Sequence, residues 1–162
     1  MTAAVQRLNH AVLYVSDVDR SVAFYRDVLG FDVAAHLGNA AFMRAHGSAN
    51  DHDLGLFGIG PNPTAPPRRA TGLYHLAWQV DTINELAELR SGLLEAGSLV
   101  GESDHGVSKS LYAVDPDGIE FEVMWAVPVA DWPNAPSTER LDLDAALARY
   151  AGVSTLHATT AH

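Results

Sequence analysis

The chain repeats one order of predicted secondary structure, and this duplication constrains its fold more than any other feature of the 162-residue sequence. The segments LNHAVLYVSD (8–17) and LYHLAWQVDT (73–82) align with a constant offset, so that His10 and His75 take equivalent places. Each segment is followed by a helical pattern and then by three short β-rich stretches. A unit of this size buries its sheet poorly alone, so we expect the two copies to pack against each other or against a second chain.

Each copy begins with a strand and continues with a helix. In the first copy the helix follows the strand 8–16, Asp17 or Asp19 can cap it, and Gly30 ends it. In the second copy the helix is TINELAELRSGLLEAG, which ends at Gly97. The remaining predicted strands are FDVAAHL, AAFMRAH and HDLGLFGIG in the first copy and 98–103, 109–114 and 118–126 in the second.

The sequence therefore predicts an α+β fold of two tandem βαβββ modules, 6–60 and 72–127, joined by a proline-rich linker. We expect them to form a single domain over 1–127, with a curved mixed sheet around a cup that holds a metal ion. Residues 128–162 form a C-terminal extension outside the repeat.

The charge and composition exclude several classes of partner. The formal net charge is -10, from 10 basic and 20 acidic residues, which disfavours nucleic acid and anionic membrane surfaces. The chain has no cysteine, so disulfides and thiolate ligands are excluded. We found no signal-type segment and no apolar run near the ~20 residues that span a bilayer, and we expect a cytoplasmic protein.

The two equivalent histidines fall on matching strand faces. Because side chains alternate along a strand, His10 shares a face with Val12 and Tyr14, and His75 shares the matching face with Ala77. If the sheets curve around a common cavity, both imidazoles point into it.

The last strand of the second copy adds carboxylates to this face. Glu120 and Glu122 lie on one side, and Phe121 and its apolar neighbours lie on the other. Aligning Leu-Gly-Leu of the first copy with Phe-Glu-Val of the second sets Gly55 against Glu122. Two imidazoles and one carboxylate, with open positions beside them, suit a divalent metal such as non-haem Fe(II) that accepts substrate and oxygen at adjacent positions.

Three motifs resemble a known family. The repeat, SVAFYRDVLGF in the first helix and DPDGIEFEV before the last strand are similar to the vicinal oxygen chelate superfamily, which includes glyoxalases, extradiol dioxygenases and bleomycin- or fosfomycin-resistance proteins. The resemblance covers residues 6–127. The segment DHGVSKSLYAVDPDG most resembles the catechol 2,3-dioxygenase branch.

The resemblance implies roles for five residues. The family's carboxylate ligand lies four residues after the glycine of Asp-Pro-Asp-Gly, which is Glu122 here rather than Glu120. Tyr112 matches the tyrosine that binds the substrate oxygen, and His105 lies in the loop that supplies a further hydrogen-bonding group for proton transfer. The implied metal ligands are His10, His75 and Glu122.

The implied activity is extradiol cleavage of a catechol-type ring with Fe(II) and O2, with Mn, Zn, Ni or Co as alternative metals. The implied substrate is a small aromatic molecule or one with vicinal oxygens. A homodimer is expected, because many members of the family pair modules between chains.

The sequence also departs from the dioxygenase pattern. An acid/base histidine is expected about fourteen or fifteen residues before His75, where Gly60 and Pro61 stand, and His52 is the nearest candidate upstream. Ile119 replaces an asparagine, and there are two modules where many dioxygenases have four. Two alternatives stay open: a glyoxalase- or epimerase-like isomerase or lyase, which would use a fourth protein ligand, and a non-catalytic drug-binding resistance protein, which would need no metal ligands.

Overall fold

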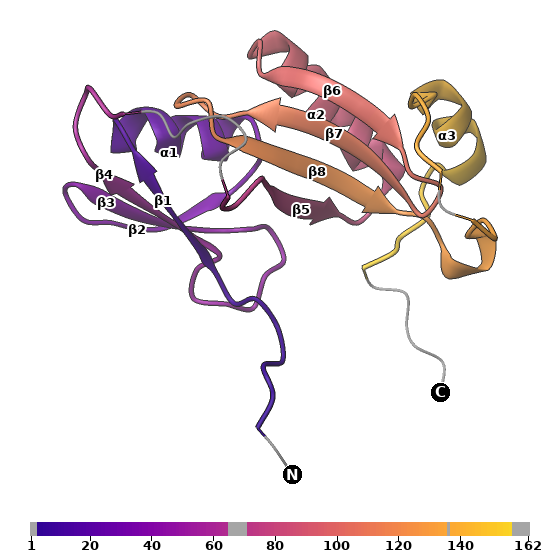
Figure 1. The fold of residues 1–162 in the computed structure, drawn as a ribbon, viewed down its shortest axis with the longest axis horizontal. Helices are drawn as coiled ribbons and strands as arrows, with labels where there is room; N and C mark the ends of the chain where they lie inside the picture. Colours follow the sequence, from indigo (N-terminus) through magenta and orange to yellow (C-terminus); the bar gives the residue numbers. More distant parts are fainter. Residues whose placement is uncertain (1–2, 65–70, 136, 157–162) are drawn as a thin grey trace. The chain divides into compact units, whose positions relative to one another are not determined.

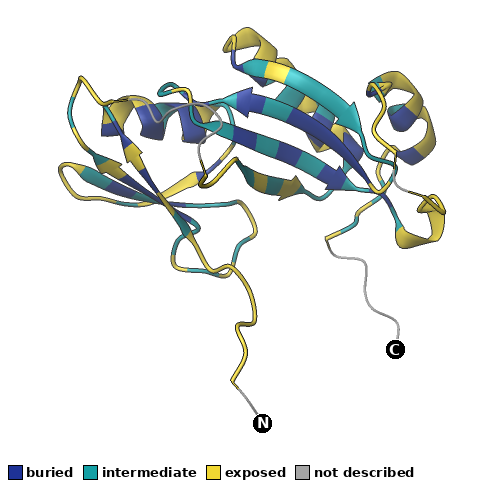
Figure 2. Cartoon of the chain, in the orientation of Figure 1, coloured by how far each residue is buried: buried dark blue, intermediate teal, exposed yellow. Residues whose placement is uncertain are grey.

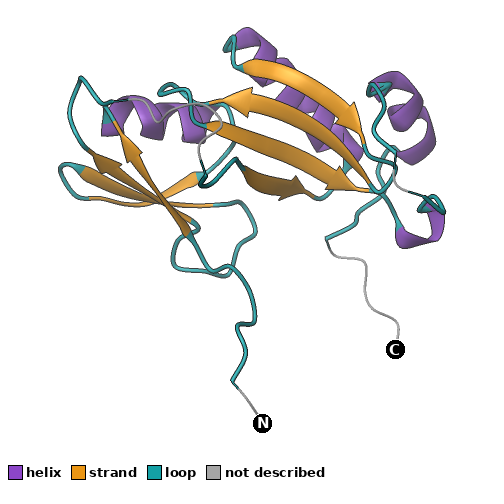
Figure 3. Cartoon of the chain, viewed as in Figure 1, coloured by secondary structure: helices purple, strands orange, loops and turns teal. Residues whose placement is uncertain are grey.

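The computed structural model describes residues 3–64, 71–135 and 137–156, in two compact units, Met1–Ala70 (unit 1) and Thr71–His162 (unit 2). Each unit runs in the predicted order of strand, helix and three strands (Figure 3). The elements of unit 1 are β1 (Ala11–Val15), α1 (Val18–Asp27), β2 (Asp32–His36), β3 (Ala40–Arg44) and β4 (Leu54–Gly58). Those of unit 2 are β5 (Leu76–Val80), α2 (Ile83–Glu95), β6 (Leu99–Asp104), β7 (Ser108–Val114), β8 (Glu120–Ala126) and α3 (Leu143–Tyr150).

Each unit has its own four-stranded mixed sheet, and the two sheets have the same topology (Figure 1). The strand orders are β1-β4-β3-β2 and β5-β8-β7-β6, with the first two strands of each parallel and the others antiparallel. Val12 pairs with Gly55 in unit 1, and Ala77 pairs with Glu122 in unit 2. The predicted alignment of Gly55 with Glu122 is therefore confirmed, as is the α+β fold of two tandem modules.

Capping residues fix the start of the long helices. The Asp17 carboxylate accepts a hydrogen bond from the Arg20 amide, and Thr82 with Glu85 forms a capping box in which each side chain accepts from the backbone of the other. One turn after each helix a glycine adopts positive φ, at Gly30 (72°) and at Gly97, as a C-terminal cap requires. Each helix covers the apolar face of its own sheet.

Strand β8 shows the alternation that separates core from site. Phe121, Val123 and Trp125 are buried where α2 packs on β8, and by alternation Glu120 and Glu122, which are half-buried, lie on the opposite, open face of the sheet. Figure 2 shows this alternation of buried and half-buried residues along β8. Three large side chains at one face supply several kcal/mol of hydrophobic stabilisation, about 2 kcal/mol for each. The core therefore holds the strand in a register that keeps the carboxylates on the open face.

The histidines lie one residue outside the strands in which they were predicted. β1 begins at Ala11, whose amide donates to the Asp53 carbonyl, and β5 begins at Leu76. His10 and His75 thus directly precede the first paired residue. A strand begins where its neighbour offers a partner, which local sequence does not reveal.

The C-terminal extension belongs to unit 2. Helix α3 packs on α2, and the Tyr150 ring lies 5.1 Å from the Trp125 ring between centroids. After α3 the chain is bound to one carboxylate: Asp81 Oδ1 accepts hydrogen bonds from Ser154 Oγ, Thr155 N and Leu156 N. In the part of the chain that the structure describes, no helix has the length and apolar character needed to cross a membrane.

Candidate metal centre

His75 and Glu122 form the centre of the open face in unit 2. The parallel pairing of β5 and β8 brings them together, with His75 Nε2 3.1 Å from Glu122 Oε2. Their side chains are only 22% and 13% exposed, and His75 Nδ1 is buried without a hydrogen-bond partner among the described residues. Two adjacent ligands of one ion, each about 2.1 Å from it, also lie about 3 Å apart, so this pair fits a divalent metal.

His10 in unit 1 is held in a tautomer that can bind a metal through Nε2. Its Nδ1 lies 2.8 Å from Asn9 Oδ1, and an amide oxygen only accepts, so Nδ1 carries the hydrogen and Nε2 keeps its lone pair. Asn9 is fixed in turn by Asn50, whose Nδ2 donates to the Asn9 carbonyl and to Asp53 Oδ1. The network therefore prepares Nε2 of His10 for a ligand.

Tyr112 lies beside the His75–Glu122 pair. It is the cross-strand partner of Glu122 on β7, and its ring centroid is 5.8 Å from that of His75. Burial, and then the negative charge of Glu122, raises the pKa of the Tyr112 phenol above its usual value of 10.0. Tyr112 is thus kept protonated, and its hydroxyl lies 2.8 Å from His105 Nε2.

His52 lies against His10 in unit 1. The two ring centroids are 4.5 Å apart, and His52 Nδ1 is 2.7 Å from Asp51 Oδ2. The hydrogen bond from His52 is the main cause that lowers the pKa of Asp51. A cavity of about 480 Å³ adjoins this histidine and is lined by Ala34, Ala35, Phe42, Arg44, Asp51 and His52. His52 is not at the position expected for the acid/base histidine, but it lies next to a predicted metal ligand.

Four of the five predicted site residues come together in unit 2, namely His75, His105, Tyr112 and Glu122, and His10 lies in unit 1. Neither unit by itself, as far as its residues are described, gathers three acidic or histidine side chains that could hold a metal. Glu120 interacts with the hydroxyl of Tyr74, which raises the pKa of that phenol.

Sequence reasoning missed two polar residues that hold predicted site residues. Asn9 directly precedes His10, and an amide at this place could have been noticed as a partner of the ring. Thr138 Oγ1 lies 3.2 Å from His105 Nδ1 across 33 positions of sequence. No local pattern signals such a contact.

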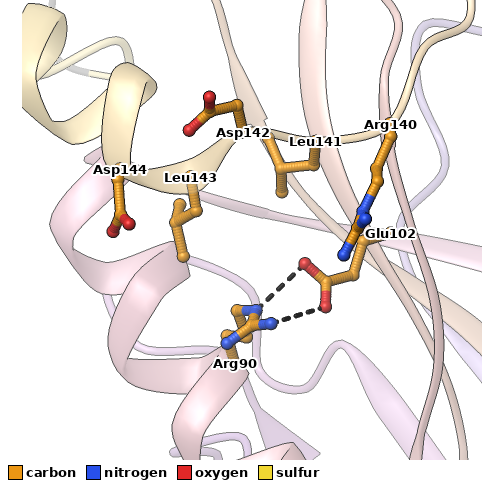
Figure 4. Close-up of a pocket in the computed structure, with 7 residues that line it drawn as sticks. All are labelled: Arg90, Glu102, Arg140, Leu141, Asp142, Leu143 and Asp144. Carbon is orange, nitrogen blue, oxygen red and sulfur yellow. Dashed lines mark hydrogen bonds and ion pairs between the residues drawn. The ribbon is translucent and has the colours of Figure 1, made fainter.

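A second pocket, of about 400 Å³, lies in unit 2 but includes none of these site residues (Figure 4). Arg90 on α2 and Glu102 on β6 form a two-pronged ion pair across it, with both N···O distances 2.9 Å. The other walls come from the extension, from Arg140 to Asp144. The ion pair joins α2 to β6. The charged residues of this pocket therefore have a structural role, and no binding role is needed to explain them.

Comparison with known proteins adds to this geometry. The family described as "Glyoxalase/Bleomycin resistance protein/Dioxygenase superfamily" matches residues 7–123. The chain is 34% identical over 128 residues to a catechol-2,3-dioxygenase of Bacillus subtilis (strain 168), covering 77% of this chain and 43% of that relative. It is 28% identical over 145 residues to a manganese-dependent 2,3-dihydroxybiphenyl 1,2-dioxygenase of Geobacillus genomosp. 3, covering 86% and 42%. The chain thus spans less than half the length of these dioxygenases.

Shorter proteins match over more of their length. A glutathione transferase FosA of Serratia marcescens is 28% identical over 119 residues, which cover 74% of this chain and 80% of that protein. A crystal structure of a glyoxalase/dioxygenase from Nostoc punctiforme aligns with a TM-score of 0.63 at 20% identity, over 79% of this chain and 99% of that one. These three curated relatives are named as enzymes that act on small molecules, and the name of one states that it depends on manganese.

Proposed function

Because the chain belongs to the glyoxalase/bleomycin resistance protein/dioxygenase superfamily, we propose that it is a metal-dependent extradiol dioxygenase for a catechol-type substrate. Its metal ligands would be His10, His75 and Glu122. The observation that supports this proposal most directly is the His75–Glu122 pair, 3.1 Å between Nε2 and Oε2, with the Tyr112–His105 hydrogen bond beside it.

The ligand set favours Fe(II), because two histidines and one carboxylate with open positions beside them are typical of non-haem Fe(II) oxygenases. Mn, Zn, Ni or Co are alternatives. When bound, the metal would hold two adjacent substrate oxygens and pass electron density from the ring to O2. Gly55 stands in unit 1 where Glu122 stands in unit 2, so the first module adds no further side-chain ligand at this register position. Coordination positions then remain for substrate and oxygen.

Tyr112 and His105 would move the substrate proton. We assign the donor role in this hydrogen bond to the Tyr112 hydroxyl and the acceptor role to His105 Nε2, which leaves the phenol oxygen free to accept a hydrogen bond from a substrate hydroxyl. As the substrate proton passes to the Tyr112 oxygen, the phenol proton passes to His105. The substrate becomes anionic, Tyr112 is neutral again, and His105 becomes an imidazolium.

Anaerobic loading with Fe(II), followed by oxygen uptake with a panel of catechols, tests this proposal. We expect about one metal ion per chain, oxygen consumption that requires both metal and catechol, and a yellow ring-cleavage product. Glu122→Ala should abolish the uptake. Stoichiometric metal without oxygen uptake from any catechol in the panel would contradict the dioxygenase proposal.

A metal-dependent transferase is the second candidate. It is favoured by the length match, since the chain covers 80% of the FosA relative but 43% of the catechol-2,3-dioxygenase. The same three ligands would hold the metal, and transfer of glutathione, the activity for which the FosA relative is named, would replace oxygen uptake as the activity measured. An isomerase or lyase is less well supported, because Gly55 cannot supply the fourth ligand that such enzymes would use.

A further inference from the structure

We propose that the C-terminal extension is part of the site, and that Thr138 is a positioning residue that holds His105 ready to take the Tyr112 proton. This inference rests on the proposed function, since it gives His105 its role. The part of the extension concerned is here called the strap, and it consists of Pro133, Thr138 and Glu139. The strap lies beyond residues 7–123, the part of the chain that the family model matches.

The strap is bound to the loop that carries His105. Glu139 pairs with Asp104 as an antiparallel bridge, with N···O distances of 2.9 and 2.8 Å for its two backbone hydrogen bonds. Pro133 packs against Gly106, because a Cβ added at that glycine would lie 2.6 Å from Pro133 Cγ. The strap therefore contacts the residue before His105 and the residue after it.

The same loop is also fixed from within unit 2. The Asp104 carboxylate accepts hydrogen bonds from the Gly106 amide, at 2.8 Å, and from Lys109 Nζ, whose side chain is only 11% exposed. The His105 amide donates to the Ser108 carbonyl at 2.9 Å. The backbone of His105 is therefore set, and what remains free to vary is the orientation of its ring.

Thr138 fixes that ring. We assign the His105 ring hydrogen to Nδ1, because a phenol is a good donor to an imidazole and Tyr112 would then donate to Nε2. Nδ1–H then donates to Thr138 Oγ1, 3.2 Å away. With one partner at each nitrogen the ring cannot turn over without losing both hydrogen bonds. When the proton arrives from Tyr112, the imidazolium keeps an acceptor at Nδ1.

Three variants test this role. Thr138→Val keeps the shape of the side chain but removes the acceptor, and Thr138→Ser keeps the acceptor. Ser137→Ala is the control, since it changes the neighbouring residue, which is not part of the strap. For the Fe(II)-loaded enzyme with a catechol, we expect Thr138→Val to lower kcat about threefold to tenfold with KM little changed, the effect of one lost hydrogen bond. Thr138→Ser and Ser137→Ala should stay within about twofold of wild type.

The second readout is 15N NMR of the His105 ring in the metal-free protein. Wild type should show Nδ1–H as the main tautomer, and Thr138→Val should show a mixture of both. Identical His105 shifts in wild type and Thr138→Val, or an unchanged kcat in an active enzyme, would overturn the proposal. If the wild-type protein cleaves no catechol, the proposed function fails, and the NMR comparison still decides whether Thr138 fixes the ring.

Discussion

Two glutamates on one face of β8 have different surroundings although only one residue separates them. Glu122 is 13% exposed and contacts the imidazole of His75. Glu120, at the beginning of the strand, interacts with the hydroxyl of Tyr74 at the protein surface. The two residues thus form a matched pair for deciding which carboxylate binds metal.

We expect Glu122→Ala to lower metal affinity at least about tenfold, because it removes one of three proposed ligands, and Glu120→Ala to leave it unchanged. Elemental analysis after Fe(II) loading and dialysis measures the difference. Equal metal loss from the two variants would show that the register does not select Glu122. Retention of metal by both would remove Glu122 from the ligand set.

At the scale of single residues, sequence predicted what depends on strand alternation. The open face of β8 and the equivalence of Gly55 with Glu122 follow from a period of two and from the repeat. The hydrogen bond between His105 and Thr138 could not be predicted, because it joins residues 33 positions apart in segments without periodicity.

At the scale of elements, helices were easier to predict than strand ends. Asp17, one of the two residues expected to cap the first helix, caps α1. Thr82, the first residue of the second predicted helix, caps α2 together with Glu85. Strand β1 begins later than expected because its first partner, the carbonyl of Asp53, lies far along the chain. The ends of a strand that depend on a distant partner therefore cannot be predicted from the local sequence alone.

The contact between the strap and its loop can be measured with two glycines. Gly106 and Gly118 both have positive φ, 76° and 78°, but a Cβ would meet Pro133 only at Gly106 and nothing within 4 Å at Gly118. Alanine at either position costs about 1–2 kcal/mol of backbone strain, and overpacking adds about 1–3 kcal/mol at Gly106 alone. Urea unfolding should therefore rank Gly106→Ala as the less stable variant. Equal stabilities would mean that the strap does not pack on Gly106.

Asp104, which joins the loop and the strap, makes stability depend on pH. Burial alone would raise the pKa of this carboxyl, but hydrogen bonds from Lys109 and the Gly106 amide outweigh it, so the pKa is lowered from 3.8. A lowered pKa in the folded state stabilises the fold above the unfolded pKa, and this contribution is lost as pH falls through the folded pKa.

We therefore expect the stability difference between wild type and Asp104→Asn to be constant from about pH 7 to pH 5 and to shrink below about pH 4. Chemical unfolding at several pH values measures it, with Asp32→Asn at an exposed position of β2 as a control. A difference that stays constant down to about pH 2 would show that the Asp104 carboxylate does not gain its stabilising interactions from the charged form.

At the scale of the whole molecule, the duplication predicted two modules but not how modules pair. Both modules have the same strand order, and the proposed ligands are divided between them, with His10 in unit 1 and His75 and Glu122 in unit 2. No pattern in the sequence states whether a module pairs with the other module of its own chain or with one from a second copy. The homodimer expected from the family resemblance corresponds to the second arrangement, in which each metal ion would be held by two chains.

Mixing two inactive variants tests this arrangement. His10→Ala and Glu122→Ala each lack one proposed ligand, so each alone should bind little metal. If modules pair between chains, a mixed dimer has one site with both defects and one site with none, so random mixing should restore about a quarter of the wild-type sites. If modules pair within a chain, every site keeps one defect and nothing is restored. Refolding the variants together, followed by metal analysis and oxygen uptake, separates the two cases, and a tagged mixed dimer should reach about half of the wild-type sites because its composition is fixed.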